Sequence, residues 1–210
     1  VRATADRATA DRRARRRLAS AGPPRDPQGF TDPGAMLARA HELDSGLTVR
    51  LRLARPTDAR RVREFLERQS QDTISRRFFT AMPRITETTV RHFTHYDPRQ
   101  VTIVAATALI DGAEEIVGLA DVALLDTGLA EIGVIVDDRH QGEGLGRLLS
   151  EAIAWLAVQR GASHLKAEMI DRNVPMLRLM QRLGPTVEGA EHGVSSAWTR
   201  LPALRTAAAA

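Results

Sequence analysis

A strand that leads into a glycine-rich turn and then into a helix is the segment most clearly suited to bind a ligand. Residues 129–136 read LAEIGVIV, the turn at 137–146 reads DDRHQGEGLG, and a helical pattern follows up to Gly161. Gly144 and Gly146 permit positive φ angles and let a ligand approach the backbone closely. The N–H groups of such a turn, together with the positive end of the following helix, attract anions. The segment therefore predicts a binding site for a phosphate or a pyrophosphate.

Two common nucleotide-binding motifs do not fit this turn. The P-loop of nucleoside triphosphatases needs a lysine, and the chain holds a single lysine, Lys166, which lies outside the turn. The turn also lacks the full G-x-G-x-x-G spacing of dinucleotide-binding folds, and it follows several strands instead of the first one. The remaining structural alternative is a plain strand-turn-helix corner whose glycines serve only its geometry.

The turn resembles a cofactor-binding loop of a known enzyme family. Residues 141–146 read QGEGLG, which is similar to the Q/R-x-x-G-x-G/A loop that binds the coenzyme A pyrophosphate in the GNAT superfamily of acyl-CoA-dependent N-acyltransferases. Asn173 and the helix after it resemble the second cofactor motif of that family. The resemblance covers about residues 47–201. It implies an α/β (α+β) fold in which helices flank a mixed, mostly antiparallel sheet.

Three segments narrow the resemblance within this superfamily. They read SRRFF at 75–79, AEIGVIV at 130–136 and NVPMLRLMQRLG at 173–184. Together they are similar to the catalytic domain of Pat-type protein lysine acetyltransferases. The resemblance implies acetyl-CoA as the acyl donor and the ε-amine of a protein lysine as the acceptor.

The resemblance also implies which residues bind the cofactor. The backbone of Val134, Ile135 and Val136 is expected to bind the pantetheine arm like an added strand. The N–H groups of the loop are expected to bind the pyrophosphate, and Asn173 is expected to bind near the pantetheine, although it also fits a helix N-cap. The complete predicted set is Val134, Ile135, Val136, Gln141, Gly142, Glu143, Gly144, Leu145, Gly146, Arg147 and Asn173.

Glu131 is the predicted general base. An amine with a pKa of about 10 is mostly protonated at neutral pH, and a carboxylate that takes its proton enables attack on a thioester. Glu131 matches a glutamate of Pat-type enzymes, but strand alternation alone also fits a glutamate that faces solvent. Many GNAT enzymes place a tyrosine acid seven residues after the motif asparagine, where this chain has Met180. The general acid therefore stays unassigned, and water or an unassisted thiolate are the alternatives.

The composition limits the class of protein. The chain has 210 residues, no cysteine and a net charge of +4. The first 30 residues carry +5 and the others −1, so the body lacks the positive charge that nucleic-acid binding requires. The absence of cysteine excludes disulfide scaffolds and thiolate metal sites. No apolar run approaches the roughly 20 residues that span a bilayer, so we expect a cytoplasmic protein without a membrane partner.

Three regions divide the chain. Residues 1–45 are predicted to form a flexible tail rich in Arg, Ala and Pro, because large apolar residues are nearly absent there. Residues 46–204 are predicted to form the acetyltransferase domain, and residues 205–210 a disordered end. The predicted strands are 47–54, 101–110, 115–125, 129–136 and 164–170, with a hairpin in 185–201. The predicted helices lie in 55–70, 72–82, 85–96, 147–161 and 173–184.

Several alternatives remain open on the sequence. The acceptor of the acetyl group is a protein lysine, a small amine or a peptide N-terminus. A second class is an acyl-CoA-sensing module without turnover, which Met180 favours and Glu131 opposes. A third is a tether that binds nucleic acid through the basic tail. His92 and His95 have H-x-x-H spacing without an evident third ligand, so no metal is expected. The oligomeric state is open between a monomer and a homodimer.

Overall fold

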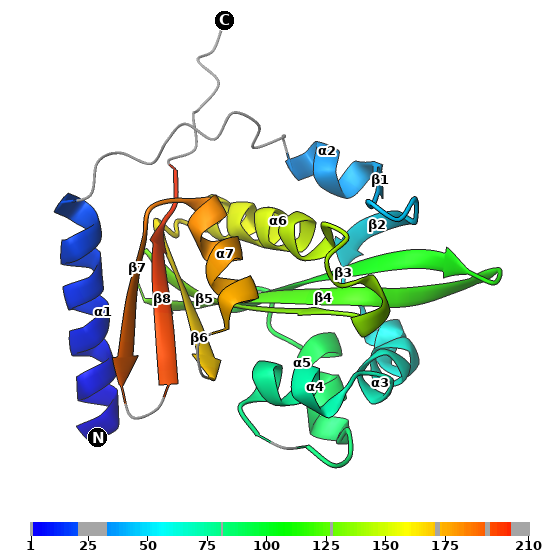
Figure 1. The fold of residues 1–210 in the computed structure, drawn as a ribbon, viewed down its shortest axis with the longest axis horizontal. Coiled ribbons are helices and arrows are strands. Elements are labelled where there is room, and N and C mark those ends of the chain that lie inside the picture. Colours follow the sequence, from blue (N-terminus) through cyan, green and yellow to red (C-terminus); the bar gives the residue numbers. More distant parts are fainter. Residues whose placement is uncertain are drawn as a thin grey trace, which may run out of the picture.

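A single eight-stranded sheet organises the fold (Figure 1). The computed structural model describes residues 2–20, 33–80, 82–126, 128–170, 173–191 and 194–202. The strand order is β1-β2-β3-β4-β5-β6-β8-β7, and all neighbours are antiparallel except β5 and β6. The strands are β1 Ala40–Glu42, β2 Thr48–Leu53, β3 Val101–Ile110, β4 Ala113–Asp126, β5 Leu129–Val136, β6 His164–Ile170, β7 Thr186–Glu191 and β8 Val194–Arg200. The predicted mixed, mostly antiparallel sheet is confirmed.

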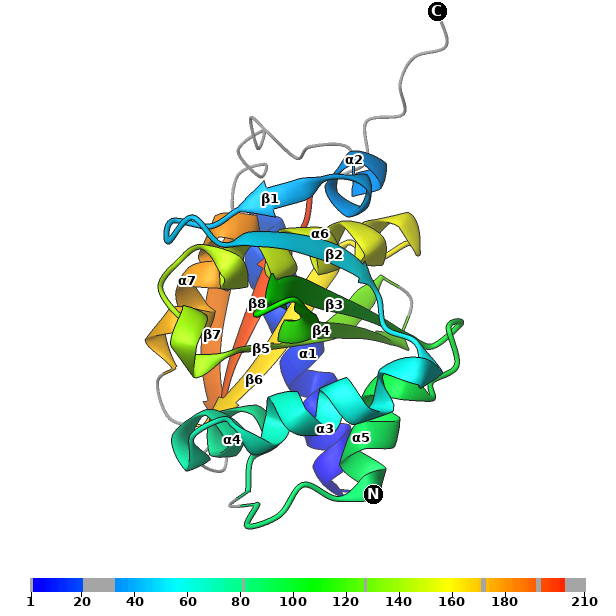
Figure 2. The same cartoon turned by 90° about the vertical axis from the view of Figure 1, so that its right-hand side faces the viewer.

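Helices cover both faces of the sheet. Figures 1 and 2 show α6 and α7 on one face and α3, α4 and α5 on the other. The helices are α1 Arg2–Ser20, α2 Pro33–Ala38, α3 Ala59–Glu67, α4 Gln71–Phe78, α5 Glu87–Thr94, α6 Leu145–Gln159 and α7 Val174–Leu183. Each face has its own core, with Leu149 and Ile153 of α6 in one, and Phe65 of α3 and Phe93 of α5 in the other.

Local sequence signals account for several element ends. Ser70 begins α4 because its hydroxyl accepts a hydrogen bond from the Thr73 N–H at 3.2 Å. The turn between β3 and β4 has φ of 50° at Asp111 and 81° at Gly112, as a tight hairpin requires. Helix α4 ends at Phe78, earlier than predicted, because Phe79 adopts a left-handed conformation with φ of 60°.

The N-terminal region differs from the flexible tail predicted for residues 1–45. Residues 2–20 form α1, which lies along β7 and β8 (Figure 1). Leu18 is fully buried and Ala14 nearly so, in a cluster with Leu129 and Trp198. The flexible tail was predicted because large apolar side chains are scarce there, whereas this interface uses alanines, one leucine and polar contacts. The interface of α1 therefore cannot be recognised from the number of large apolar residues in the sequence.

A second correction concerns the residues just before the predicted domain start at 46. Met36 of α2 is buried, and β1 extends the sheet by pairing with β2, with Ala40 opposite Arg50. The sheet therefore begins at Ala40, which is six residues before the predicted domain start at 46 and seven before the predicted first strand at 47. Residues 21–32 of the predicted tail and the predicted disordered end at 205–210 lie outside the described residues. Among the described helices none is long and apolar enough to cross a membrane; the cytoplasmic location stays a prediction.

Candidate active site

Strands β5 and β6 separate at Glu131, and this gap is the centre of the candidate site. Their parallel pairing joins Leu129 to His164 and ends at Glu131 opposite Lys166. Beyond that pair β5 continues to Val136 while β6 turns away from it (Figure 1). The backbone of residues 132–136 is therefore unpaired by β6, and an extended ligand can add to it as a strand does.

The turn after β5 provides an anion site at the start of α6. Gly142 and Gly144 have φ of 82° and 88°, which favours glycine at both positions. A Cβ at either position would meet no atom within 4 Å, so space lies open beside the backbone. Gly144 is the N-cap of the 15-residue α6, whose N-terminal N–H groups and dipole favour a negative ligand.

A buried carboxylate fixes the start of this turn. Asp137 is bound by Arg68 Nε at 2.6 Å and by Arg139 Nη2 at 3.0 Å, and its N–H donates to Val117 O at 2.9 Å. Burial raises the pKa of the Asp137 carboxyl, but the hydrogen bonds from Arg139 and Arg68 outweigh burial and lower it to about 2. Asp137 therefore stays ionised and holds the turn to β4 and α3.

The predicted cofactor residues converge on one cavity of about 960 Å³. Of the predicted set, the cavity is lined by Glu131, Val134, Ile135, Val136, Gln141, Gly142, Gly144, Gly146, Arg147 and Asn173. Two members do not line it. Leu145 is fully buried in the core, and Glu143 accepts a hydrogen bond from Ser45 Oγ at 2.6 Å.

Two polar side chains of the predicted set also bind the protein itself. Gln141 Nε2 donates to Asp138 Oδ1 at 2.8 Å, which holds the loop beside α4. Asn173 Oδ1 accepts from the Met176 N–H at 3.1 Å, so Asn173 is the N-cap of α7. Asn173 still lines the cavity. Met180, which stands where the family tyrosine is common, is fully buried and faces the core instead.

Glu131 lies at the point where the two strands separate. Its face of β5 also carries Gly133 and Ile135, and Ile135 packs in the core under α3 and α5. Burial is the main cause that raises the pKa of the Glu131 carboxyl above its ordinary value, and the negative charge of Glu168 raises it further. Lys166 and Arg7 oppose that shift. A half-buried carboxylate with a raised pKa is suited to accept a proton.

A charged pair that no sequence pattern indicated lies beside Glu131. Arg77 of α4 forms an ion pair with Asp121 of β4. Its guanidinium lies 5.3 Å from the Phe78 ring centre and 5.7 Å from that of Phe93, and it crosses β5 over Gly133. In the sequence, this region was indicated only by the resemblance of segment 75–79 to Pat-type enzymes. Arg178 and Arg182 of α7 also line the cavity, and no sequence signal distinguished them.

The only lysine of the chain lies behind Glu131. Lys166 is 3% exposed, and its Nζ lies 2.9 Å from Glu168 Oε1 and 3.4 Å from Asp11 Oδ1. It also lies 5.7 Å from the Trp198 ring centre. These contacts make Lys166 a buried, charge-balanced cation next to the candidate base, and they connect the site to α1.

Residues 59–184 match the model of the acetyltransferase (GNAT) family. The chain belongs to this family. Among solved structures, the GNAT domain of S. lividans PAT is similar to this GNAT chain at 30% identity and a TM-score of 0.68. That match covers 78% of this chain and 96% of the other.

Two more distant structures share the fold with this GNAT chain. The acetyltransferase yncA of Salmonella typhimurium, solved with its cofactor acetyl-CoA, matches at 18% identity and a TM-score of 0.55, over 73% of this chain and 94% of that chain. The cAMP-binding acyltransferase of Mycobacterium smegmatis matches at 21% identity and a TM-score of 0.54, over 82% of this chain and 49% of that one. The protein is therefore an acetyltransferase.

Proposed function

We propose that this GNAT acetyltransferase transfers the acetyl group of acetyl-CoA to the ε-amine of a protein lysine, with Glu131 as general base. The observation that carries the proposal is the position of Glu131. It lies at the last paired position of β5 and β6, inside the cavity that also contains the glycine loop. A carboxylate at this point shares one cavity with both substrates, the acyl donor and the amine.

The cofactor roles follow from the free backbone and the anion site. The backbone of Val134, Ile135 and Val136 binds the pantetheine arm along the unpaired side of β5. The N–H groups from Gly142 to Arg147 bind the pyrophosphate, with Gly144 and Gly146 allowing close approach. Asn173 caps α7 and offers its side-chain amide to the pantetheine. The nearby cations Arg178 and Arg182 suit the remaining phosphate charge.

The reaction begins with an ammonium group that must lose its proton. Glu131 takes that proton, directly or through water, and the free amine attacks the thioester carbonyl carbon. The N–H of Val134 stabilises the oxyanion that forms. The new carbon–nitrogen bond remains as the carbon–sulfur bond breaks, and coenzyme A leaves as its thiolate. The second proton that the nitrogen loses passes to that thiolate or to water. Because the pKa of the Glu131 carboxyl is raised, its carboxylate is a stronger base than an ordinary glutamate.

Two observations support a lysine acceptor. Three segments of the sequence resemble the catalytic domain of Pat-type lysine acetyltransferases, and the S. lividans PAT domain is 30% identical. In addition, Glu131 lines the cavity and forms no ion pair with a described residue, so its carboxylate can attract the cationic end of a lysine.

The proposal is tested by measuring thiol release from acetyl-CoA with matched acceptors. The acceptors are lysine peptides, the same peptides with lysine replaced by arginine and a free N-terminus, and a panel of small amines. We expect turnover with the lysine peptides and none with peptides that offer only an α-amine. Turnover confined to small amines or to peptide N-termini would contradict the lysine assignment while leaving the acetyltransferase activity intact.

A further inference from the structure

Helix α1 is attached to the sheet face that carries Glu131. Glu131 is opposite Lys166 across β5 and β6, and Lys166 is opposite Trp198 across β6 and β8. Side chains at paired positions of neighbouring strands project to the same side of a sheet. On this side α1 places Asp11, which accepts from Trp198 Nε1 at 2.9 Å. Helix α1 therefore lies on the same side of the sheet as α4 and α5.

The active-site cavity borders the space beneath α1. Glu168 lines both that cavity and a second one, of about 670 Å³, between α1 and the strands β7 and β8. One carboxylate oxygen of Glu168 lies 2.6 Å from Arg7 of α1. Arg13 and Arg17 also line the second cavity. An acceptor that reaches Glu131 from this side of the sheet is thus flanked by α4 and by α1.

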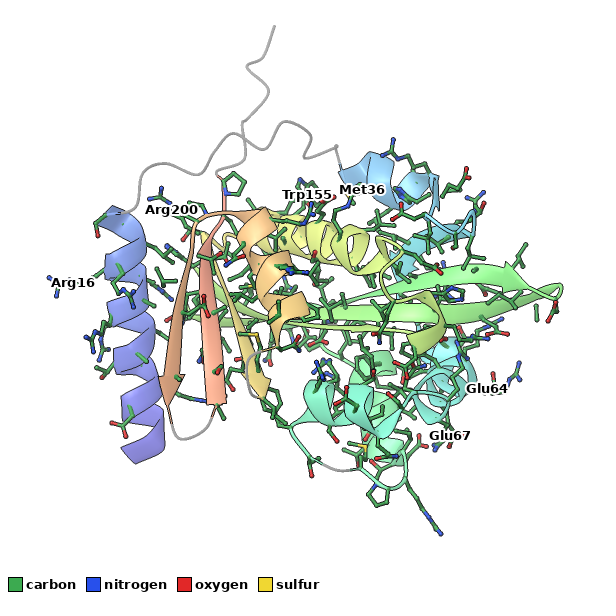
Figure 3. All side chains as sticks on the ribbon, viewed as in Figure 1. Arg16, Met36, Glu64, Glu67, Trp155 and Arg200 are labelled. Carbon is green, nitrogen blue, oxygen red and sulfur yellow. The ribbon has the colours of Figure 1, made fainter. Side chains whose placement is uncertain are left out.

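Helix α1 also carries exposed positive charge that its ion pairs with the body do not balance. Four of its arginines are exposed and form no ion pair within the described part of the chain: Arg12, Arg13, Arg16 and Arg17. Figure 3 shows Arg16 projecting away from the sheet. By contrast, Arg7 and Arg15 are paired with Glu168 and Asp126 of the body. Arg7 and Arg15 therefore attach the helix through ion pairs, whereas Arg17 donates to Glu188 O at 3.5 Å and Arg12 to Thr9 Oγ1 at 3.3 Å without meeting a carboxylate.

We propose that these four exposed arginines of α1 bind an acidic surface of the acceptor protein and hold it beside the active-site cavity. The inference rests on the proposed lysine acetyltransferase function and adds the surface chemistry of its acceptor. Residues 12–17 span about 8 Å along the helix, so one acidic patch can contact all four. Arginine pairs well with carboxylates and is enriched in protein interfaces.

The position of the surface favours a protein partner over nucleic acid. A protein that docks on α1 lies beside the cavity in which its lysine must react. The body outside the first 30 residues has a net charge of −1, so it offers no continuation of the basic surface along a nucleic-acid backbone. A short basic patch next to an active site instead raises the rate of encounter with an acidic substrate.

The test compares three lysine peptides of equal length that carry an acidic, a neutral or a basic tract beside the lysine. In the variant, Arg12, Arg13, Arg16 and Arg17 are replaced with Gln, which keeps good helix formers in α1. The unchanged protein should acetylate the acidic peptide with a kcat/KM about 10-fold above the neutral one, through a lower KM. The preference should shrink as NaCl rises from about 50 to about 300 mM. The variant should lose the preference and keep its kcat/KM on the neutral peptide.

A matched control removes the same charge elsewhere. Four exposed arginines outside α1 are replaced with Gln: Arg39, Arg50, Arg60 and Arg99. The control should keep the preference for the acidic peptide. Equal losses in both variants, or a preference that survives in the α1 variant, would overturn the inference.

The remaining outcomes separate this inference from the function on which it rests. Acetylation of all three peptides without a charge preference overturns the docking surface and leaves the lysine acceptor standing. Acetylation of small amines alone overturns both. A short DNA oligonucleotide that binds the unchanged protein but not the α1 variant, in the absence of any peptide preference, would assign the arginines to nucleic acid instead.

Discussion

Glu131 is a residue whose role depends on its neighbours. Alternation along β5 is compatible with a glutamate that simply faces solvent, and only the family resemblance favoured catalysis. The structure places the residue opposite Lys166, at the last position before β5 and β6 separate. Burial and the charge of Glu168 then raise the pKa of its carboxyl. These neighbours come from β6, and no local sequence pattern links β6 to β5.

Replacing Glu168 with Gln tests the electrostatic part of this account. Glu168 is one of the causes that raise the pKa of Glu131, so its neutralisation should lower that pKa. A base with a lower pKa stays deprotonated to lower pH, so the acid limb of the pH profile of kcat/KM should move to lower pH. The measurement is that profile for both proteins.

The control for this prediction is Glu64→Gln. Glu64 lies on the exposed side of α3, away from the sheet (Figure 3), and should leave the acid limb unmoved. An acid limb that stays in place in Glu168→Gln, or moves to higher pH, would show that Glu131 does not set it.

The ion pair between Arg77 and Asp121 could not be predicted from the sequence. Arg77 lies on α4 and Asp121 on β4, and they meet only because α4 packs over β5 at Gly133. Segment 75–79 was noted for its resemblance, not for this contact. Charged residues that pair across the fold leave no periodic trace in a single sequence.

Among the elements, the segment from β5 through the loop to α6 was predicted best. Its glycines, its strand pattern and its helix start all lie close together in sequence, so local signals sufficed. The approach of α7 to β8 was not predictable in this way. It depends on Gly184, where an added Cβ would lie 2.2 Å from the Arg200 carbonyl oxygen.

Two glycine substitutions should therefore differ sharply. Gly184→Ala forces the backbone of α7 and β8 apart and should lower the free energy of unfolding by about 1–3 kcal/mol. Gly146→Ala adds a Cβ 3.6 Å from Leu179, which is an ordinary contact, and should leave stability within about 0.5 kcal/mol. Urea unfolding of the two variants provides the comparison. Equal stability of both would mean that the close approach at Gly184 relaxes without cost.

The turn that precedes the loop should make stability depend on acid pH. The pKa of Asp137 is lowered to about 2, whereas in the unfolded chain it returns to 3.8. The stabilisation is therefore present above about pH 4 and is lost as the pH falls toward 2, and it amounts to about 2 kcal/mol. Unfolding curves from pH 5 to about 2 should show a smaller acid-dependent loss for Asp137→Asn than for the unchanged protein. Parallel losses in the two proteins would contradict this assignment.

At the scale of the whole molecule, the main surprise is that the basic N-terminal segment joins the fold. Its interface with β7 and β8 consists of Ala14, Leu18 and polar contacts such as Asp11 with Trp198. A prediction based on large apolar residues assigns such a segment to solvent. The sheet and the order of its helices were predictable because their apolar patterns are regular. The position of α1 depends instead on its contacts with strands that are distant in sequence.

Leu18 should anchor α1 to the body. Leu18→Ala removes a fully buried side chain from a small cluster, so α1 should separate more often from the sheet. Hydrogen exchange of the backbone amides of α1 should increase about 10-fold or more, while exchange in α6 stays unchanged. Ala19→Ser, at an exposed position of the same helix, is the control and should have little effect. Unchanged exchange in Leu18→Ala would mean that other contacts hold α1.

The central claim is that Glu131 takes the proton from a protein lysine during acetyl transfer. The most direct measurement uses isotope-labelled acetyl-CoA and a deacetylated protein lysate, with mass spectrometry to locate the label. We expect label on the ε-amines of discrete lysines, with rates that fall about 10²–10⁴-fold in Glu131→Gln while acetyl-CoA still binds. Label found only on α-amines or small molecules, or lysine labelling at equal rates in Glu131→Gln, would contradict it.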